Sequence, residues 1–404
     1  MKTVAVALLI LFASSFPLAA QASKRAVNAS YEVVAYYFPN YHPNPQNQAR
    51  YGKGWTEWRL LQQATPRFAG HQQPKVPLWG YDDESTPGAM ARRIDAAAGH
   101  GVTCFLFDWY WHNTGPFLDR ALDRGFLQAA NRSRIKFALM WANHDWIEIF
   151  PAKPGVKPEL IYPGAVSRET FDRLADHAIR KYFTQPNYWK VDGKPYFSIY
   201  ELMTFVKGLG GLKQARLALD DFREKVKAAG LPGLHVNAVA FGIKPQGLAG
   251  SVDEMLSALN VDSVTSYCWI HHAGLRDFPA TQYPAWAEES ARVWDQLRGQ
   301  FQVPYYPNVS MGWDSTPRTD PGGKWENFGY PYTPVVAGNT PAEFRKALER
   351  VKKFLDQQPA GPKIFTINAW NEWTEGSYLE PDKKKGWEYL RAIQAVFGQG
   401  SASR

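Results

Sequence analysis

Residues 363–376 read KIFTINAWNEWTEG, an apolar and β-branched run that passes into polar and acidic side chains. The run Lys363–Trp370 has the composition of a buried strand. Asn371, Glu372 and Glu375 follow it directly. In folds built from parallel strands and helices, side chains that follow a strand gather at one end of the sheet. The stretch therefore predicts both a core strand and an acidic site at its C-terminal end.

Seven further runs of this kind recur along the chain, each followed by a segment with helical periodicity. The runs are Val33–Pro39, Val102–Trp109, Lys136–Ala142, Pro195–Tyr200, Leu234–Phe241, Ser263–Cys268 and Tyr305–Met311. The predicted helices are Gly88–Ala98, Phe117–Asn131, Arg168–Phe183, Leu212–Ala229, Val252–Ala258, Ala285–Phe301, Ala342–Gln358 and Lys385–Phe397. Eight strand–helix units predict an α/β fold, a single-domain (β/α)8 TIM barrel with elaborated βα loops. An open doubly wound sheet would carry a Gly-rich turn after its first strand, where this chain has PNYHPNPQNQ.

The first 22 residues have the features of a secretory signal peptide. Lys2 precedes an apolar stretch at Val4–Phe12, and Ala20 and Ala22 flank Gln21 in a cleavage pattern. That stretch is shorter than the roughly 20 residues needed to cross a bilayer. We therefore expect residues 1–22 to be a signal peptide and residues 23–404 to be one barrel domain. We expect export to the periplasm or the medium, without stable membrane insertion.

The composition narrows the class of ligand. The formal charge is +8, and the basic residues are dispersed apart from Lys383–Lys385. This pattern argues against nucleic-acid binding and hints only weakly at an anionic ligand. Aromatic residues make up 15% of the chain and include 16 Trp, which suits stacking against sugar rings. We expect a monomer. We also expect two buried free thiols, because Cys104 and Cys268 lie in strands on opposite sides of the predicted barrel and cannot form a disulfide.

Polar and aromatic side chains follow most of the predicted strands, or lie on the long loop after the first one. We expect them to surround a glycan substrate at the C-terminal ends of the strands. An acidic strand end can also cap a loop, and the residues of the long loop can simply anchor it. The candidate substrate-binding residues are Tyr41, His42, Trp55, Glu57, His71, Asp108, Trp109, Tyr110, Trp141, Asn143, Asp145, Glu201, Tyr267, Trp313 and Asn371.

Glu372 and Glu375 are the candidate catalytic pair. Glycoside hydrolysis needs a proton donor for the leaving oxygen and a second carboxylate acting as nucleophile or base. Side chains three residues apart come within about 5–6 Å of each other on a helical turn. Two carboxylates so close repel, which keeps one of them protonated. The alternative is an ordinary charge pair at a helix N-terminus.

Other chemistries have weaker support in the sequence. His271 and His272 are adjacent but lack a nearby set of Asp, Glu or Cys ligands, so we predict no catalytic metal. No G-x-S-x-G motif is present to support serine catalysis. We predict no cofactor.

Five blocks in the mature chain resemble glycoside hydrolase family 99 and the related bacterial WbsX-like family. They occur in the family's order: YYFPNYHP (36–43), GKGWTEW (52–58), GHQQP (70–74), LMWANHDW (139–146) and NAWNEWTEGSYLEP (368–381). The likeness is closer to the WbsX-like branch. It implies a TIM barrel that acts on glycans and, in family 99, retaining hydrolysis of α-mannosides through a 1,2-anhydro sugar.

The resemblance also implies roles for the two glutamates. Glu372 would take the proton of the substrate 2-hydroxyl, and Glu375 would act as general acid and then as base. This chain has His144 and Asp145 where the WbsX-like block usually has Glu-Asn. It has Thr374 where family 99 has histidine. These differences leave the sugar specificity open.

Two other functions fit the same sequence. WbsX-like proteins are often assigned to polysaccharide assembly, so a glycosyltransferase is one alternative. Export argues against it, because activated sugar donors are cytoplasmic. A sugar-binding protein on a degenerate barrel is the other alternative. The intact pair Glu372 and Glu375 argues against that one, because binding alone needs no acid and base.

Overall fold

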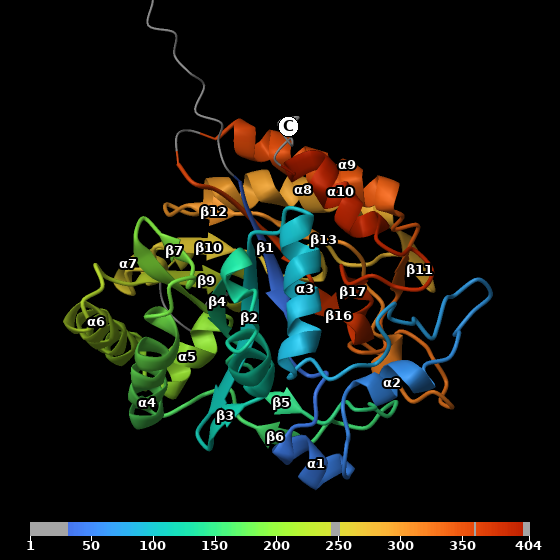
Figure 1. Ribbon diagram of the computed structural model, residues 1–404, viewed down its shortest axis with the longest axis horizontal. Helices are drawn as coiled ribbons and strands as arrows, with labels where there is room; N and C mark the ends of the chain where they lie inside the picture. Colours follow the sequence, from blue (N-terminus) through green and yellow to red (C-terminus); the bar gives the residue numbers. More distant parts are fainter. Residues whose placement is uncertain (1–30, 244–250, 359–360, 399–404) are drawn as a thin grey trace, which may run out of the picture. The chain divides into compact units, whose positions relative to one another are not determined.

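A barrel of parallel strands occupies the centre of the protein (Figure 1). The computed structural model describes residues 31–243, 251–358 and 361–398, so the expected signal peptide lies outside the described residues. From Tyr31 onward the chain forms one unit. The barrel strands are β1 (Tyr31–Tyr37), β2 (Cys104–His112), β4 (Lys136–Trp141), β8 (Lys194–Ile199), β9 (His235–Val239), β10 (Ser263–Thr265), β12 (Tyr305–Tyr306), β13 (Asn308–Ser310) and β15 (Lys363–Asn368).

A strand that a proline interrupts completes the barrel. Strands β12 and β13 are two halves of one strand that Pro307 interrupts, because proline has no N–H to donate to a neighbour. The first half pairs with β10 and the second with β15, which in turn pairs with β1. The Pro307 carbonyl accepts a hydrogen bond of 2.9 Å from the backbone N–H of Thr366. The eight predicted strands are therefore all present, and the predicted barrel is confirmed.

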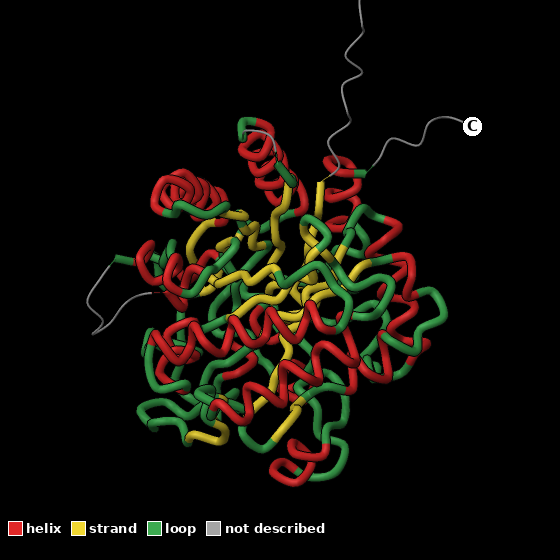
Figure 2. Tube along the Cα trace, turned by 90° about the vertical axis from the view of Figure 1, so that its left-hand side faces the viewer, coloured by secondary structure: helices red, strands yellow, loops and turns green. Residues whose placement is uncertain are grey.

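Helices surround the strands, as the red and yellow segments of Figure 2 show. They are α3 (Pro87–Gly99), α4 (Arg168–Ala178), α6 (Leu212–Ala228), α7 (Val252–Ala258), α8 (Tyr283–Gln300), α9 (Pro341–Asp356) and α10 (Glu388–Phe397). Side-chain caps fix several of their first turns. Thr86, Ser167 and Thr340 each accept a hydrogen bond from the backbone three residues ahead, and Ser251 forms a reciprocal capping box with Glu254.

The predicted helix Phe117–Asn131 is wrong as a single element. Its first residue belongs to β3 (Gly115–Phe117), which pairs with the end of β2 as a hairpin. Only a short π-helical segment, η1 (Ala121–Phe126), and a 3-10 turn, η2 (Arg132–Arg134), follow. Gly125 lies so close to the Glu84 carbonyl that an added Cβ would be 2.4 Å from its oxygen. The close contact with the Glu84 backbone and the β2–β3 hairpin together prevent the single helix that the periodicity predicts.

Strand β2 shows how the barrel separates its two faces. All nine of its residues are buried. Trp109 and Trp111 point outward and pack against His177 of α4. Asp108 and Tyr110, at the alternate positions, line a cavity at the barrel mouth. Alternate side chains of β2 thus face opposite ways: one set packs against the helices and the other set lines the cavity.

Insertions after the strands build the mouth of the barrel. Strand β1 points toward the lower edge of Figure 1, where several of these elements lie. They are α1 (Pro45–Tyr51), α2 (Trp58–Gln63), β5 (Trp146–Ile147), β6 (Leu160–Tyr162) and α5 (Leu202–Gly208). Strands β11 (Ala280–Gln282) and β14 (Val335–Ala337) pair with each other in the loops after β10 and β13.

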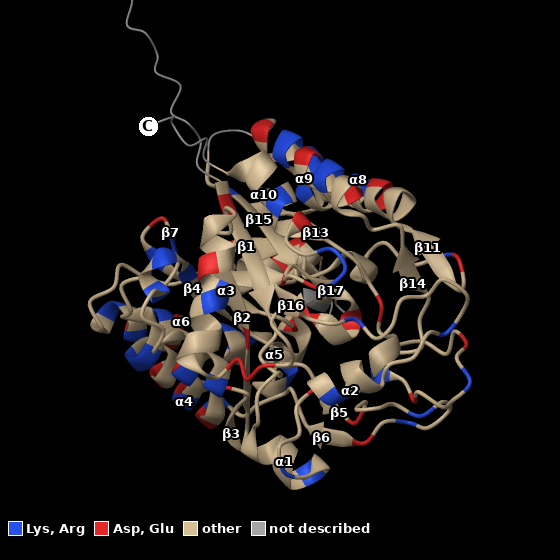
Figure 3. Cartoon of the chain, turned by 45° about the vertical axis from the view of Figure 1, so that its right-hand side comes forward, with Lys and Arg blue, Asp and Glu red and all other residues tan. Residues whose placement is uncertain are grey.

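Two further expectations concern thiols and charge. Cys104 and Cys268 are both buried and free, as predicted. Basic and acidic residues are interleaved along the outer helices α8 and α9, as the blue and red segments of Figure 3 show. None of the helices in the described ranges is both long and apolar enough to cross a bilayer.

Candidate active site

A cavity of about 690 Å³ opens at the C-terminal ends of the strands. Glu372 and Glu375 lie on one side of it, and Asp108 and Tyr267 line it as well. Its remaining walls are largely aromatic, with Phe38, Tyr110, Trp146, Phe150, Tyr200, Phe241, Trp313 and Tyr330 among the lining residues. Volume and lining are typical of a small-molecule site that binds flat or cyclic ligands.

The glutamate pair lies on a tight hairpin just beyond β15. Strand β16 (Asn371–Glu372), the 3-10 turn η7 (Trp373–Glu375) and β17 (Ser377–Tyr378) form it. Gly376 follows Glu375 with φ of +66°, and a Cβ there would lie 2.5 Å from Asp314 Cβ. Only glycine fits both the left-handed backbone and that close approach. The turn brings both glutamates to the cavity, whereas on a continuing strand they would face opposite sides.

One guanidinium joins the two glutamates. Arg318, at the end of the 3-10 turn η6 (Thr316–Arg318), donates from Nη1 to Glu375 Oε1 at 2.5 Å and from Nη2 to Glu372 Oε2 at 3.3 Å. Tyr330 Oη also donates to Glu375 Oε1, at 2.8 Å. A third carboxylate, Glu57, accepts from Arg318 Nε at 2.8 Å. Arg318, Tyr330 and the three glutamates thus form a buried hydrogen-bonded cluster at the barrel mouth, which we call the hub.

The cluster holds more carboxyl groups than it has positive charge to neutralise them. Glu57, Glu372, Glu375 and Asp108 are all buried, and Arg318 is the cation that contacts three of them. Burial, and next the charge of Glu375, raises the pKa of Glu372 well above its ordinary value, although Arg318 opposes the shift. Burial likewise raises the pKa of Asp108. Both shifts favour the protonated forms of Glu372 and Asp108, and for Glu372 the charge of Glu375 contributes in the direction that the repulsion argument predicts.

Tyr267 connects the fourth carboxyl group to the pair. Its hydroxyl contacts Asp108 Oδ2 at 2.9 Å and Glu372 Oε1 at 3.4 Å. The other oxygen of Asp108, Oδ1, is buried and has no partner in the described chain. A buried polar atom without a partner costs about 1–3 kcal/mol. An orphan atom on a cavity-lining residue is well placed to bind a hydroxyl of a ligand.

Eight of the predicted site residues line this cavity. They are Asp108, Tyr110, Asp145, Glu201, Tyr267, Trp313, Glu372 and Glu375. Asp145 also accepts a hydrogen bond from the backbone of Gly164 at 2.9 Å, so one of its oxygens fixes a loop.

Four of the other predicted residues do not line the cavity but support it. Asn143 and Asn371 each form two hydrogen bonds to backbone, with Glu201 and Phe38 respectively, and so fix the ends of neighbouring strands. Tyr41 supports the turn that carries the glutamate pair by accepting from the Thr374 backbone N–H at 3.2 Å. Glu57 acts on the pair through Arg318.

The remaining five predicted residues pack or pair elsewhere. Trp109 and Trp141 face the helices, the latter against Phe171 and Phe205. The other three are loop residues: His42 contacts Glu84, Trp55 packs at a tilt against Tyr51, and His71 contacts Asp314.

Among the cavity residues that the sequence-based prediction missed, Arg318 and Tyr330 contact the glutamate pair directly. Arg318 and Tyr330 both lie in the long segment between β13 and β14, which has no strand pattern. Its length was the available signal, since long loops at a barrel mouth commonly carry function. Within the described residues, no three His, Cys, Asp or Glu side chains form a group able to hold a metal ion.

Comparison with solved structures supports the fold. The GH99 endo-alpha-mannosidase from Bacteroides thetaiotaomicron is similar over 91% of this chain and 96% of its own, with a TM-score of 0.56 and 13% identity. A second structure, described as a glycoside hydrolase-like protein, gives a TM-score of 0.57 and 16% identity over 92% of this chain and 95% of its own. At these identities the likeness shows a shared barrel.

Sequence comparison identifies the family. The protein WxcX of Xanthomonas campestris pv. campestris, strains B100 and ATCC 33913, is described as uncharacterized and is 29% identical over 369 residues. That match covers 90% of this chain, which spans about half (49%) of the length of those relatives. The model of the family described as Glycosyltransferase WbsX matches residues 33–393. The chain therefore belongs to this WbsX family.

Proposed function

We propose that this protein is a glycosidase that cleaves a glycan in the cavity beside Glu372 and Glu375. The observation that carries the proposal is the buried pair itself, held by Arg318 in an aromatic cavity, with the pKa of Glu372 raised by burial and by the charge of Glu375. A protein that only binds sugar has no need for adjacent carboxyl groups whose burial is this costly. Acid/base hydrolysis needs them.

The proposed roles follow the family resemblance. Glu372 takes the proton of a hydroxyl on the substrate, and Glu375 protonates the leaving oxygen. The raised pKa of Glu372 makes its carboxylate a stronger proton acceptor. The same shift favours the protonated form of Glu372, so the proton of the pair must pass from Glu372 to Glu375 before they act as base and acid. Activity should therefore fall once the pH is high enough to remove that proton from the pair.

Export of the protein is part of the proposal and rests on residues 1–22 alone. An exported hydrolase would meet polymeric glycans outside the cytoplasm. A glycosyltransferase of polysaccharide assembly, as the family's description suggests, would instead need an activated sugar donor. Both functions could use the same carboxyl groups, and they differ in whether water or a sugar hydroxyl receives the glycosyl group.

Purified protein should first be screened against α-mannans, other neutral glycans and anionic polysaccharides, with chromatography of the products. On a cleaved substrate, Glu372→Gln and Glu375→Gln should each reduce turnover about 10²–10⁴-fold. Glu349→Gln, on the exposed face of α9, is the matched control and should leave turnover unchanged.

The two variants should differ on an aryl glycoside whose leaving group needs no protonation. Such a substrate should partly restore Glu375→Gln and leave Glu372→Gln inactive, because the latter lacks the base. Rescue of Glu372→Gln alone would reverse the roles. Tight glycan binding without cleavage would replace this proposal with a binding function, and sugar transfer from a nucleotide donor would replace it with a transferase.

A further inference from the structure

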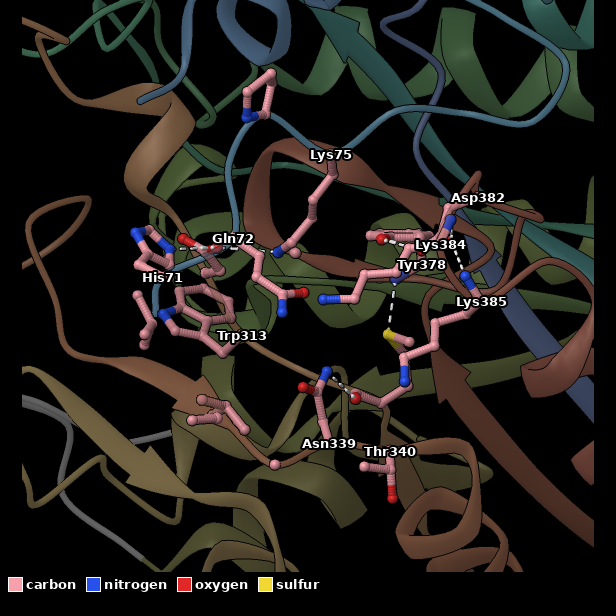
Figure 4. A pocket seen from close by; sticks show the side chains of 18 of the residues that line it. His71, Gln72, Lys75, Trp313, Asn339, Thr340, Tyr378, Asp382, Lys384 and Lys385 are labelled. Carbon is pink, nitrogen blue, oxygen red and sulfur yellow. Dashed lines mark hydrogen bonds and ion pairs between the residues drawn. The ribbon is translucent and has the colours of Figure 1, made fainter. Parts of the chain in front are cut away.

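A second cavity of about 520 Å³, whose lining residues are drawn in Figure 4, adjoins the cavity that holds the glutamate pair. Trp313 lines both cavities. Glu375 lines the first and the next residue, Gly376, lines the second. A ligand in the second cavity would therefore lie directly beside the proposed catalytic centre. Its volume is within the range of small-molecule sites.

The second cavity is cationic. Lys75, Lys383, Lys384 and Lys385 line it, against Asp314 and Asp382. In Figure 4, Lys75 and Lys384 come from facing segments and extend toward the same space. Four ammonium groups against two carboxylates give an excess of positive charge in a partly enclosed space, which attracts anions.

The two aspartates are already fully engaged by the protein. Asp314 accepts from Lys75 Nζ at 2.9 Å, from His71 Nε2 at 3.0 Å and from Gln73 Nε2 at 2.7 Å. Burial favours the neutral form of Asp314, but Lys75 and His71 reverse this and hold its pKa below the ordinary value.

Asp382 is engaged by its own loop. It accepts from Tyr378 Oη at 2.7 Å and from the backbone N–H groups of Lys384 and Lys385. No ion pair among the described residues includes Lys383, Lys384 or Lys385. The side chains of this lysine triplet therefore remain available to a ligand.

Other lining residues suit a sugar. Phe68 and Trp313 offer aromatic surfaces, and Gln72, Asn339 and Thr340 offer amide and hydroxyl groups. Aromatic planes with hydrogen-bonding groups at their edges are typical of sites that hold sugar rings. The combination with free ammonium groups specifies a sugar that carries negative charge.

We propose that the second cavity binds an acidic sugar residue, such as a uronic acid, of the glycan that is cleaved beside it. This inference rests on the proposed function and adds a substrate class to it. Because Trp313 lines both cavities, the proposal is that one glycan chain extends past its ring from the first cavity into the second. The Lys383–Lys385 triplet would then select acidic glycans over neutral ones.

The test is a binding titration that does not depend on turnover. Glu372→Gln protein serves as the background, and the probes are an oligogalacturonate and a neutral manno-oligosaccharide of equal length. We expect the acidic probe to bind more tightly, and its affinity to fall when salt is raised from about 0.05 to about 0.5 M, because salt screens partly exposed charges.

Two added substitutions, Lys384→Gln and Lys385→Gln, should weaken binding of the acidic probe about three- to tenfold and leave the neutral probe unaffected. Both changes keep the backbone N–H groups that hold Asp382, so the loop should keep its shape. The control is Lys213→Gln, on α6 and away from the cavity (Figure 1), which should change neither affinity.

Equal affinity for the two probes would overturn the inference, as would an unchanged affinity in the double lysine variant. Tighter binding of uridine diphosphate than of oligogalacturonate would overturn it in favour of a nucleotide site. Binding of inorganic phosphate as tight as that of the saccharide would reduce the cavity to an anion site. Cleavage of a neutral glycan with no affinity for the acidic probe would remove this inference and leave the glycosidase proposal intact.

Discussion

Arg318→Met should destabilise the protein, and by an amount that depends on pH. The substitution keeps a long side chain but removes the cation that contacts Glu57, Glu372 and Glu375. The side chain of Arg318 is 6% exposed and that of Glu57 is fully buried. Breaking a buried ion pair by removing one partner costs about 3–5 kcal/mol. For a chain of this size that corresponds to a fall in melting temperature on the order of 4–6 °C.

The pH dependence identifies the cause. In the variant, the carboxylates left unpaired can recover part of the lost stability by taking up protons, so the deficit should be large at pH 8 and smaller at pH 5. Melting temperatures of variant and wild type at both pH values measure this. Adding Glu57→Gln to Arg318→Met should recover part of the loss at pH 8, because one unpaired charge is removed.

Arg67→Met is the matched control. Arg67 lies beside the same loop and donates to the carbonyl oxygens of Pro321 and Asp320 and to Thr319 Oγ1, and no ion pair of the described chain includes it. Its loss should cost hydrogen bonds equally at both pH values. If Arg318→Met melts with the wild type at pH 8, or if its deficit is as large at pH 5, then Arg318 does not neutralise the carboxyl cluster and the account of the site fails.

Three further predictions concern the same hub. Glu372→Gln should raise the melting temperature relative to wild type at pH 8 and much less at pH 4. Above about pH 4.5 the carboxyl of Glu372 ionises in the unfolded chain, whereas its raised pKa favours the protonated form in the folded protein, so wild-type stability falls as pH rises. An equal shift of melting temperature at both pH values would contradict the raised pKa. Glu375→Gln removes a negative charge beside Glu372 and should lower the pKa of Glu372, which the proton titration of that carboxyl, followed by infrared spectroscopy, would report as a shift to lower pH. Gly376→Ala should lower activity at least tenfold, because the added Cβ would lie 2.5 Å from Asp314 Cβ and displace the turn that carries Glu375, whereas Gly299→Ala, in helix α8 with open space around it, should be neutral in the same assay.

The fold could be predicted from the sequence because its signals are local and repeated. Each barrel strand is a short apolar run bounded by polar residues, and the observed bounds of β4 (Lys136–Trp141) and β15 (Lys363–Asn368) differ from the predicted ends by one or two residues. The failure at Phe117–Asn131 came from contacts that periodicity does not encode. The hairpin of β3 with β2, and the approach of Gly125 to Glu84, are both tertiary.

The site was only partly predictable, for a related reason. Residues at strand ends could be found by position, and Glu372, Glu375, Asp108 and Tyr267 do meet at one cavity. Position cannot tell which side of a strand faces the barrel interior, so Trp109 and Trp141 were included although they pack against helices. Arg318 could not be predicted, because it reaches Glu372 and Glu375 only through the folding of the long loop between β13 and β14.

The cost of burying this carboxyl cluster supports the proposal that the glutamate pair serves function and not stability. Four buried carboxyl groups around one guanidinium cannot all ionise, and an apolar replacement of similar volume would avoid the cost. Proteins tolerate such costs mainly where chemistry requires them. Arg318 opposes the upward pKa shift of Glu372 and orients Glu375 at the same time. A substrate that displaced the guanidinium from Glu375 would leave the two carboxyl groups sharing one proton at the bond to be cleaved, which is the state that acid/base hydrolysis starts from.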